Sequence, residues 1–520
     1  MGSILRQSGL RVAAVIVVFC AGSLTRLSLA QSPDPAEVHA ARAFDQARRQ
    51  GPPALRAFLV RMPKGADLHM HLDGSVYAET LIQEAGEDNL CVNEAQLAMD
   101  AKNHAPNCPP GESPASGVPS NQHLYDELID AFSMRTFVLV TGDSGHDHFF
   151  DSFGRFGDDN RFAPQWIDEV ASRAAVENEQ YLEIMQSGNY KPATALADSL
   201  GWDPNLAAFR QKLLSDPVFR AAVQSNRADF DAALHRREQL EHCGRSDAAP
   251  ACTVAVRFLY QVLRAHPPQR VFAQTLLGFE LASTDPHIAG INFVQPEDGY
   301  IALRDYALQM HMLDYLHSVY PQVHISLHAG ELAEGMVPPH DLTFHIRMAV
   351  ELGHAERIGH GVDIMFEDHP WQLMKEMADR HIDVEINLTS NDVILNVRGK
   401  DHPFMLYRQA GVPVTLSTDD EGVSRIDLTH EYVRAADTYP LTYHDLKLMA
   451  RTSIEHSFLP GASLWERVTP ERLETPVAAC RGQLGAEAPA GLCATLVHSS
   501  EKAQQEWDLE RRFHVFETSF

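Results

Sequence analysis

The feature that most constrains the fold is a series of eight short apolar segments, separated by stretches in which apolar residues recur with helical spacing. Segments of this kind are typical of buried strands that alternate with helices. A strand followed by a helix, repeated eight times, predicts a (β/α)8 TIM barrel of the α/β class. The predicted strands are 66–72, 180–186, 254–262, 288–294, 323–331, 356–362, 383–391 and 412–420.

A chain of 520 residues has room for additions to such a barrel. We assign residues 31–61 to an N-terminal helical segment and residues 62–520 to the barrel with its additions. Insertions are predicted at about 90–160 and 235–255, and the Pro- and Gly-rich stretch 107–120 is typical of a loop. After Pro460 we expect a cysteine-closed loop and a C-terminal helical extension, whose packing face is Trp507, Leu509, Phe513 and Phe516.

The first thirty residues have the features of a secretory signal peptide. Arg6 and Arg11 form a basic start, a short apolar core follows, and small residues precede a predicted cleavage site after Ala30. The apolar run is too short for a comfortable membrane span. A lipid anchor at Cys20 is less favoured, because the bulky Phe19 precedes it. We therefore expect an exported protein, periplasmic or secreted, without stable membrane insertion.

Six cysteines follow the predicted signal peptide, and they form three pairs that are close in sequence. Export favours disulfides, and pairing between neighbours is the simplest of about fifteen connectivities. Free buried thiols are the alternative. None of the pairs has the CxxC spacing of a cysteine zinc site. The candidate disulfides are Cys91 with Cys108, Cys243 with Cys252, and Cys480 with Cys493.

The formal net charge of -27 at pH 7 restricts the class of partner. Nucleic acids and anionic membranes bind to basic surfaces, so neither is an expected partner. The charge does not disfavour a small neutral substrate.

Polar residues cluster where the predicted strands end, which is where barrel enzymes carry their functional groups. His69 and His71 share one face of the first strand, because side chains two positions apart in a strand point the same way. Three later strands end in further clusters: His328 with Glu331, His360, and Asp419 with Asp420.

These clusters suit a catalytic zinc ion, which takes nitrogen and oxygen ligands and activates a water molecule. Glu331 and His360 are then candidates for proton transfer. The protein ligands of one Zn2+ are predicted to be His69, His71, His328 and Asp419.

The chain has 27 histidines, so a single HxH pair is weak evidence. A second pair, His146 and His148, lies in a predicted loop without matching polar clusters, and we interpret it as a solvated or edge feature. His311, His345 and His354 lie in helical or turn contexts and are interpreted as structural. Agreement among four strand ends distinguishes the first pair.

Four separated motifs carry a resemblance to a known family. They are "MPKGADLHMHLDGS", "SLHAGE", "RIGHG" and "TLSTDD", and they resemble, in the same order, the motifs of the adenosine deaminase family of metal-dependent amidohydrolases. The segment "SIEHSFLPG" is similar to the family's closing helix. The resemblance covers roughly residues 62–461, and the signal peptide and cysteines indicate an exported member.

The resemblance implies a role for each matched residue. The four ligand candidates resemble the ligands of a single zinc ion, and Glu331 resembles the residue that protonates purine N1. His360 and Asp419 resemble the groups that hold the attacking water and take its proton. The residues that resemble substrate contacts are Asp420 at purine N7, Asp73 at a ribose hydroxyl, Gly330 and Gln295. Asp73 suits a turn equally well.

One position departs from the family pattern. Members usually have a glycine after the fourth strand, whose backbone N–H approaches purine N3, whereas Gln295 takes that place here and narrows the space. Glu297 and Asp298 match the family's acidic pair, and a solvated loop explains them at least as well. The fourth strand has no lysine to bridge two metals, which favours one metal.

The resemblance implies zinc-dependent hydrolytic deamination of adenosine, and of 2'-deoxyadenosine, to inosine and ammonia. Two other functions stay open: deamination of another purine or modified nucleoside, and nucleoside binding or signalling by a site that has lost catalysis. The completeness of the site favours an enzyme. The residues Phe149, Phe150, Phe153 and Phe156 either pack in the core or cover the substrate pocket.

Overall fold

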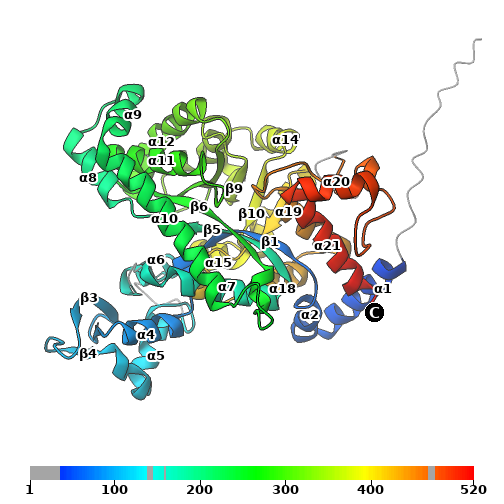
Figure 1. Ribbon diagram of the computed structural model, residues 1–520, viewed down its shortest axis with the longest axis horizontal. Coiled ribbons are helices and arrows are strands. Elements are labelled where there is room, and N and C mark those ends of the chain that lie inside the picture. The colour runs from blue at the N-terminus through cyan, green and yellow to red at the C-terminus, as the bar shows by residue number, and fades with distance from the viewer. Residues whose placement is uncertain (1–34, 138–143, 157–159, 467–472, 474) are drawn as a thin grey trace, which may run out of the picture.

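The computed structural model describes residues 35–137, 144–156, 160–466, 473 and 475–520 (Figure 1). The predicted signal peptide lies outside these residues. In the part of the chain that the model describes, no helix is both long enough and apolar enough to cross a membrane.

Eight parallel strands form the centre of the molecule, in the order β1-β5-β6-β7-β8-β9-β10-β11. Backbone hydrogen bonds from His71 N to Asp419 O and from Asp419 N to His69 O join the end of the last strand to β1 and complete the ring. The (β/α)8 prediction is confirmed. The strands are β1 (Gly65–His71), β5 (Glu179–Gln186), β6 (Ala255–Leu263), β7 (Ile288–Val294), β8 (His324–Ala329), β9 (Arg357–His360), β10 (Asp383–Ile386) and β11 (Val414–Leu416).

The strands are buried along almost their whole length, as expected for parallel strands covered by helices on their outer face. Helices follow each strand and pack around the ring (Figure 1). They are α7 (Ala163–Val176), α8 (Lys191–Leu200), α9 (Leu206–Ser215), α10 (Pro217–Leu240), α11 (Pro268–Ala282), α12 (Tyr300–Val319), α13 (His345–Glu351), α14 (Pro370–Arg380), α15 (Leu388–Leu395), α16 (Phe404–Ala410), α17 (Glu421–Ser424), α18 (Leu428–Thr438) and α19 (Tyr443–Glu455).

The first insertion contains more regular structure than the sequence predicts. Part of the stretch 107–120 forms a strand, β4, in a small antiparallel sheet of order β3-β2-β4, where a loop was expected. The Cys91–Cys108 disulfide ties this sheet to the chain that follows β3. The elements of this region are α3 (Leu72–Ser75), α4 (Ala78–Glu87), β2 (Leu90–Asn93), β3 (Ala98–His104), β4 (Glu112–Pro114), α5 (Gln122–Ala131) and α6 (Gly145–Phe156).

The predicted loop around His146 and His148 is also wrong, because both residues lie in the first turn of α6. His146 Nε2 lies 3.2 Å from Asp298 Oδ1, in the loop after β7. His148 Nε2 lies 3.1 Å from the carbonyl oxygen of Asp130. Both histidines therefore make contacts with other segments of the chain, instead of being solvated residues of a loop.

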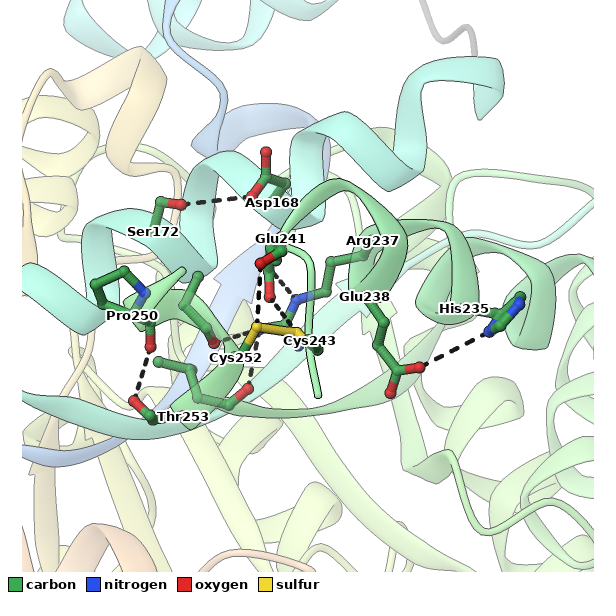
Figure 2. Close-up of a disulfide and its surroundings, with 12 residues drawn as sticks. Asp168, Ser172, His235, Arg237, Glu238, Glu241, Cys243, Pro250, Cys252 and Thr253 are labelled. Carbon is green, nitrogen blue, oxygen red and sulfur yellow. Dashed lines mark hydrogen bonds and ion pairs between the residues drawn. A yellow bond between two sulfur atoms is a disulfide. The ribbon is translucent and has the colours of Figure 1, made fainter. Parts of the chain in front are cut away.

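All three predicted disulfide pairings are confirmed. Figure 2 shows the second, in which Cys243 and Cys252 close the loop between α10 and β6. Beside it, the buried Arg237 pairs with Glu241 and donates to the carbonyl oxygens of Ala251 and Val254. These contacts fix the end of α10 to the start of β6.

The C-terminal extension packs against the N-terminal helices (Figure 1). The four predicted packing residues on α21 are all buried, and the ring of Phe516 lies 5.3 Å from that of Phe58. The elements are α1 (Pro35–Gln50), α2 (Pro52–Leu59), α20 (Gly491–Ser499), which carries Cys493, and α21 (Glu501–Glu517).

Candidate active site

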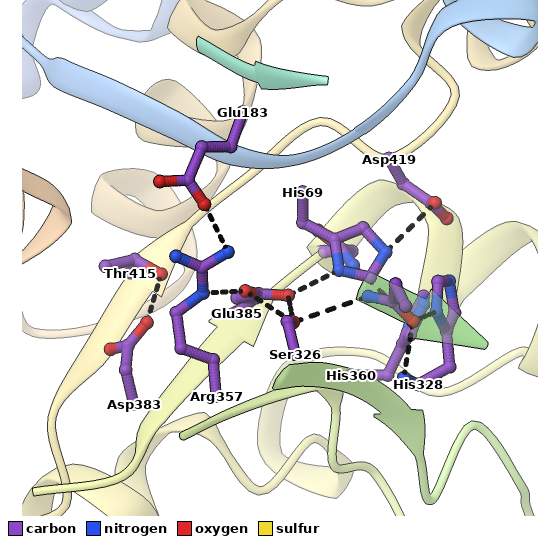
Figure 3. Close-up of polar contacts among 12 residues, drawn as sticks. His69, Glu183, Ser326, His328, Arg357, His360, Asp383, Glu385, Thr415 and Asp419 are labelled. Atoms are coloured by element: carbon purple, nitrogen blue, oxygen red, sulfur yellow. Dashed lines mark hydrogen bonds and ion pairs between the residues drawn. The ribbon is translucent and has the colours of Figure 1, made fainter. Parts of the chain in front are cut away.

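The predicted metal ligands meet at the C-terminal mouth of the barrel (Figure 3). His71 Nε2 lies 3.2 Å from His328 Nε2 and 3.3 Å from Asp419 Oδ1. His69 Nε2 lies 3.4 Å from the same Asp419 oxygen. All four side chains are buried. Gly359 makes room for this arrangement, since a Cβ there would lie 2.5 Å from the His69 ring.

A polar side chain inside the barrel holds the Nδ1 atom of each of the three imidazoles. The acceptors, at 2.6, 2.5 and 2.8 Å, are Glu385 for His69, Gln261 for His71 and Asn292 for His328. An acceptor at Nδ1 places the proton there, so that Nε2 keeps its lone pair. Three Nε2 lone pairs and one carboxylate oxygen therefore face a common centre.

His360 has the opposite hydrogen-bond arrangement. The backbone N–H of Phe404 donates to His402 Nδ1 at 3.1 Å, so His402 carries its proton on Nε2 and donates to Asn391 Oδ1 at 2.9 Å. This contact orients the Asn391 amide, whose Nδ2 donates to His360 Nδ1 at 2.9 Å. In the neutral ring the proton is then on His360 Nε2. His360 is consequently a donor toward the centre, unlike the three ligand candidates.

The donor set fits a divalent metal ion. The ligand atoms of His69, His328, His360 and Asp419 all lie within 4.8 Å of one another, and a second such group joins His71 to Asp419 and Asp420. The buried His69 Nε2 has no hydrogen-bond partner among the described residues, which costs about 1–3 kcal/mol when nothing compensates it. A cation at the centre would satisfy that atom, with Asp419 shared by both groups.

The charges around the centre favour a bound cation, and they keep the rings of His328 and His360 neutral. Burial lowers the pKa of His69, but the neighbouring carboxylates of Asp419 and Glu385 outweigh this effect and raise the pKa to about 10. The same carboxylates would attract a metal ion. Burial, with the neighbouring histidines, lowers the pKa of His328 well below its usual range. Burial also lowers the pKa of His360 to about 3, which keeps that ring neutral.

Burial favours the protonated form of two further carboxyl groups at the centre. Burial, followed by the negative charges of Asp419 and Glu297, raises the pKa of Glu331 to about 8. Burial and the adjacent Asp419 raise the pKa of Asp420 well above its usual range, and its Oδ1 has no hydrogen-bond partner in the described part of the chain. A protonated carboxyl group is a hydrogen-bond donor, so both can donate to a bound molecule.

A cavity of about 1040 Å³ opens onto these groups. The first insertion supplies one wall, because Phe149, Phe150 and Phe153 of α6 line the cavity while Phe156 packs against Phe132 in the core. Three of the four predicted substrate contacts line the cavity, namely Asp73, Gln295 and Asp420, and so does the predicted proton donor Glu331. Gly330 lies directly behind Glu331, and its N–H is directed to Glu297 at 3.1 Å.

Gln295 adopts the backbone conformation of a glycine, with φ 85°. Positive φ angles recur at the site, at 69° for His360 and 62° for Asp419, and strain of this kind clusters where function requires a fixed geometry. The Gln295 side chain turns back, and its Oε1 accepts a hydrogen bond from Ala265 N at 2.9 Å. The departure from the family's glycine therefore leaves the backbone path intact.

Sequence reasoning missed the residues that orient the histidines. Glu385, Gln261 and Asn292 are polar residues within buried strands, and a buried polar side chain on a strand is the signal that would have found them. Glu385 continues into a fully buried network, since Arg357 Nε donates to its Oε1 at 2.6 Å and Arg357 Nη2 donates to Glu183 at 2.7 Å (Figure 3).

The known sequences that are similar to this chain are described as adenosine deaminases. The family model described as adenosine deaminase matches residues 237–467. An adenosine deaminase of Vibrio atlanticus is 25% identical over 407 residues, which are 76% of this chain and 94% of that protein. An adenosine deaminase of Clostridium perfringens is 33% identical over 138 residues, which are 26% of this chain and 37% of that protein.

Solved structures show the same fold. Arabidopsis ADAL complexed with GMP has a TM-score of 0.51 and 21% identity, over 78% of this chain and 94% of that chain. The apo N6-methyl-AMP deaminase of Arabidopsis thaliana has the same TM-score and identity, over 78% and 94%.

Proposed function

We propose that the chain is a metal-dependent hydrolase of C–N bonds that deaminates adenosine and 2'-deoxyadenosine to inosine and ammonia, because the adenosine deaminase family model matches residues 237–467 and adenosine deaminases are among its relatives. One observation carries the proposal: three imidazole lone pairs and the Asp419 carboxylate converge at one end of a large cavity, beside the protonated Glu331. Such a constellation suits attack by water on an electron-poor ring carbon.

His69, His71, His328 and Asp419, whose ligand atoms are in mutual contact, would hold one Zn2+, as nitrogen and carboxylate ligands suit that ion. Bound there, the ion would lower the pKa of water and so provide a nucleophile at neutral pH. Glu385, Gln261 and Asn292 keep the ligand atoms aimed at the ion.

Glu331 is the proposed proton donor to purine N1. Its protonated carboxyl group faces the cavity, and protonation of N1 withdraws electrons from C6, the carbon that loses its amino group. General acid catalysis of this type contributes about 10²- to 10⁴-fold to a rate.

His360 and Asp419 have different proposed roles toward the attacking water molecule. His360 directs an N–H at the centre, so it donates a hydrogen bond to the water oxygen rather than taking a proton. Asp419, whose Oδ1 lies 3.3 Å from His71 Nε2 and 3.4 Å from His69 Nε2, is the group that accepts the proton. This assignment differs from the sequence-based expectation, in which both residues take the proton.

The substrate contacts follow from the lining of the cavity. The protonated Asp420 donates to purine N7, and the partly exposed Asp73 receives a ribose hydroxyl. Gln295 borders the purine through its backbone, and Gly330 supports Glu331 from behind the cavity wall. The proposal includes export, with which the three disulfides are compatible.

The first test is ammonia release from adenosine by the mature protein, with and without a strong chelator. We expect conversion to inosine that chelation abolishes and added Zn2+ restores. Folded, zinc-loaded protein that converts no adenosine would contradict the proposal. A panel of other purine nucleosides would then separate a different deaminase from a nucleoside-binding protein.

A second candidate is deamination of a larger purine compound, such as adenosine 5'-monophosphate. The cavity volume of about 1040 Å³ is at the upper end of the range for small-molecule sites. Three cationic residues also line it, although the chain is strongly acidic: Arg161, Lys191 and Arg236.

The two candidates predict different substrate preferences. If a phosphate binds near the cations, kcat/KM for the monophosphate exceeds that for adenosine. Replacing both Lys191 and Arg236 with alanine should then lower the monophosphate value by about tenfold or more, since charge-assisted contacts contribute about 1.5–3 kcal/mol, and leave adenosine unchanged. A wild-type preference for adenosine would reject the second candidate.

A further inference from the structure

Glu297, in the loop between β7 and α12, lies behind the segment that carries Glu331 and is only 1% exposed. Its Oε2 accepts the backbone N–H of Glu331 at 2.8 Å, and its Oε1 accepts that of Gly330 at 3.1 Å. Oε1 also lies 2.6 Å from His345 Nδ1. Both oxygens of this buried carboxylate therefore face donors, and the solvated loop suggested by the sequence is wrong.

His345 fixes the carboxylate in turn. The imidazole is fully buried at the start of α13 and stacks on the Tyr306 ring of α12, with centroids 3.8 Å apart and an interplanar angle of 4°. The Tyr306 hydroxyl donates to the His345 carbonyl oxygen at 2.8 Å. Glu297 is thus held by two helices that are not part of the metal centre.

The other side of the same segment is also held. The Gly330 carbonyl oxygen accepts the N–H of Val362 at 2.8 Å. Gly330 has φ 74°, and a Cβ on it would lie 2.4 Å from Asp363 Oδ1. One face of the segment is bonded to the loop after β9. On the opposite face, the N–H groups of Gly330 and Glu331 have Glu297 as their hydrogen-bond acceptor among the described residues.

We propose that Glu297 is a positioning residue for Glu331, and that His345 keeps Glu297 in place. The inference rests on the proposed role of Glu331 as the proton donor. Two consecutive backbone N–H groups end on one rigid carboxylate, so the starting point of the Glu331 side chain is set by Glu297. Displacement of a reacting group by about 1 Å can cost about 10²-fold in rate.

The kinetic test is Glu297→Gln, which keeps the shape but replaces one acceptor oxygen with an NH2 group that faces another donor. We expect kcat to fall by about 10- to 100-fold, while KM changes little and the metal content stays that of the wild type. Loss of kcat without loss of binding indicates an interaction used in the transition state.

The matched control is Glu177→Gln. Glu177 is likewise buried and accepts a backbone N–H, that of Thr429 at 2.7 Å, but it precedes β5 at the opposite end of the barrel. The Glu177→Gln variant should lose about as much stability as Glu297→Gln and keep the kcat of the wild type. At position 345, His345→Asn retains an N–H donor and should recover part of the activity that His345→Leu loses.

Hydrogen exchange supplies a readout that needs no activity. In Glu297→Gln the amides of Gly330 and Glu331 should exchange faster than in the wild type, and in Glu177→Gln they should not. Unchanged exchange in Glu297→Gln, or unchanged kcat, would overturn the inference. If the wild type deaminates no purine, the proposed function fails, and the exchange result still decides whether Glu297 holds this segment.

Discussion

Replacing Glu331 with glutamine lowers kcat for deamination by about three orders of magnitude and leaves the bound metal in place. Glutamine has the same shape and can still donate a hydrogen bond to a ring nitrogen, so substrate binding should survive. It cannot transfer a proton, and that transfer is the role that burial and the raised pKa assign to Glu331. Steady-state kinetics and metal analysis of the purified variant measure both effects.

The control for this experiment lies in the same loop. Glu334 is exposed and three residues further along, so Glu334→Gln changes the charge of the region without entering the cavity. It should retain wild-type kinetics. Loss of metal from Glu331→Gln would contradict the assigned role, because it would make Glu331 a ligand instead of a proton donor.

Replacing Arg357 with methionine destabilises the protein by about 3–5 kcal/mol, because it leaves two buried carboxylates without their cation. Arg357 is fully buried and pairs with Glu385 and Glu183 (Figure 3). It also lies 3.9 Å from the centre of the Phe458 ring. Glu385 orients His69, a proposed metal ligand, so we also expect metal affinity to fall by about 10- to 100-fold. Urea unfolding and metal titration at pH 7 measure these changes.

An exposed ion pair provides the comparison. Arg481 pairs with Glu466 at 2.7 Å, and the Arg481 side chain is 55% exposed. Arg481→Met should change the free energy of unfolding by no more than about 1 kcal/mol. If Arg357→Met proves as stable as Arg481→Met, the buried network does not stabilise the barrel. Arg357→Lys, which keeps the charge, distinguishes lost charge from lost geometry if the methionine variant does not fold.

The barrel strands and the residues around the metal centre were predictable from the sequence, because both depend on local patterns. Alternation of apolar strands with helices is a property of neighbouring residues, and the strand ends of a barrel all meet at one mouth. The spacing of His69 and His71 was therefore enough to predict that they share one face of the strand. The closed barrel was enough to predict that Asp419 lies beside them, as the structure shows.

The rest depends on contacts between distant residues. The strand β4 pairs with β2 across a polar, Pro-rich stretch whose composition indicates a loop. The first turn of α6 is held by the contact of His146 with Asp298, which no local pattern reveals. The role of Glu297 likewise appears only when the strand ends after β7 and β8 are side by side.

The hydrogen-bond chain behind His360 has a consequence for how the site behaves in different media. The hydrogen-bond chain begins at the backbone N–H of Phe404, which can only donate a hydrogen bond and never accept one. Burial lowers the pKa of both His402 and His360 to about 3, so each ring stays neutral from mildly acidic to alkaline solution. The direction in which His360 presents its N–H is thus inherited from the covalent backbone, and it stays the same wherever the chain remains folded.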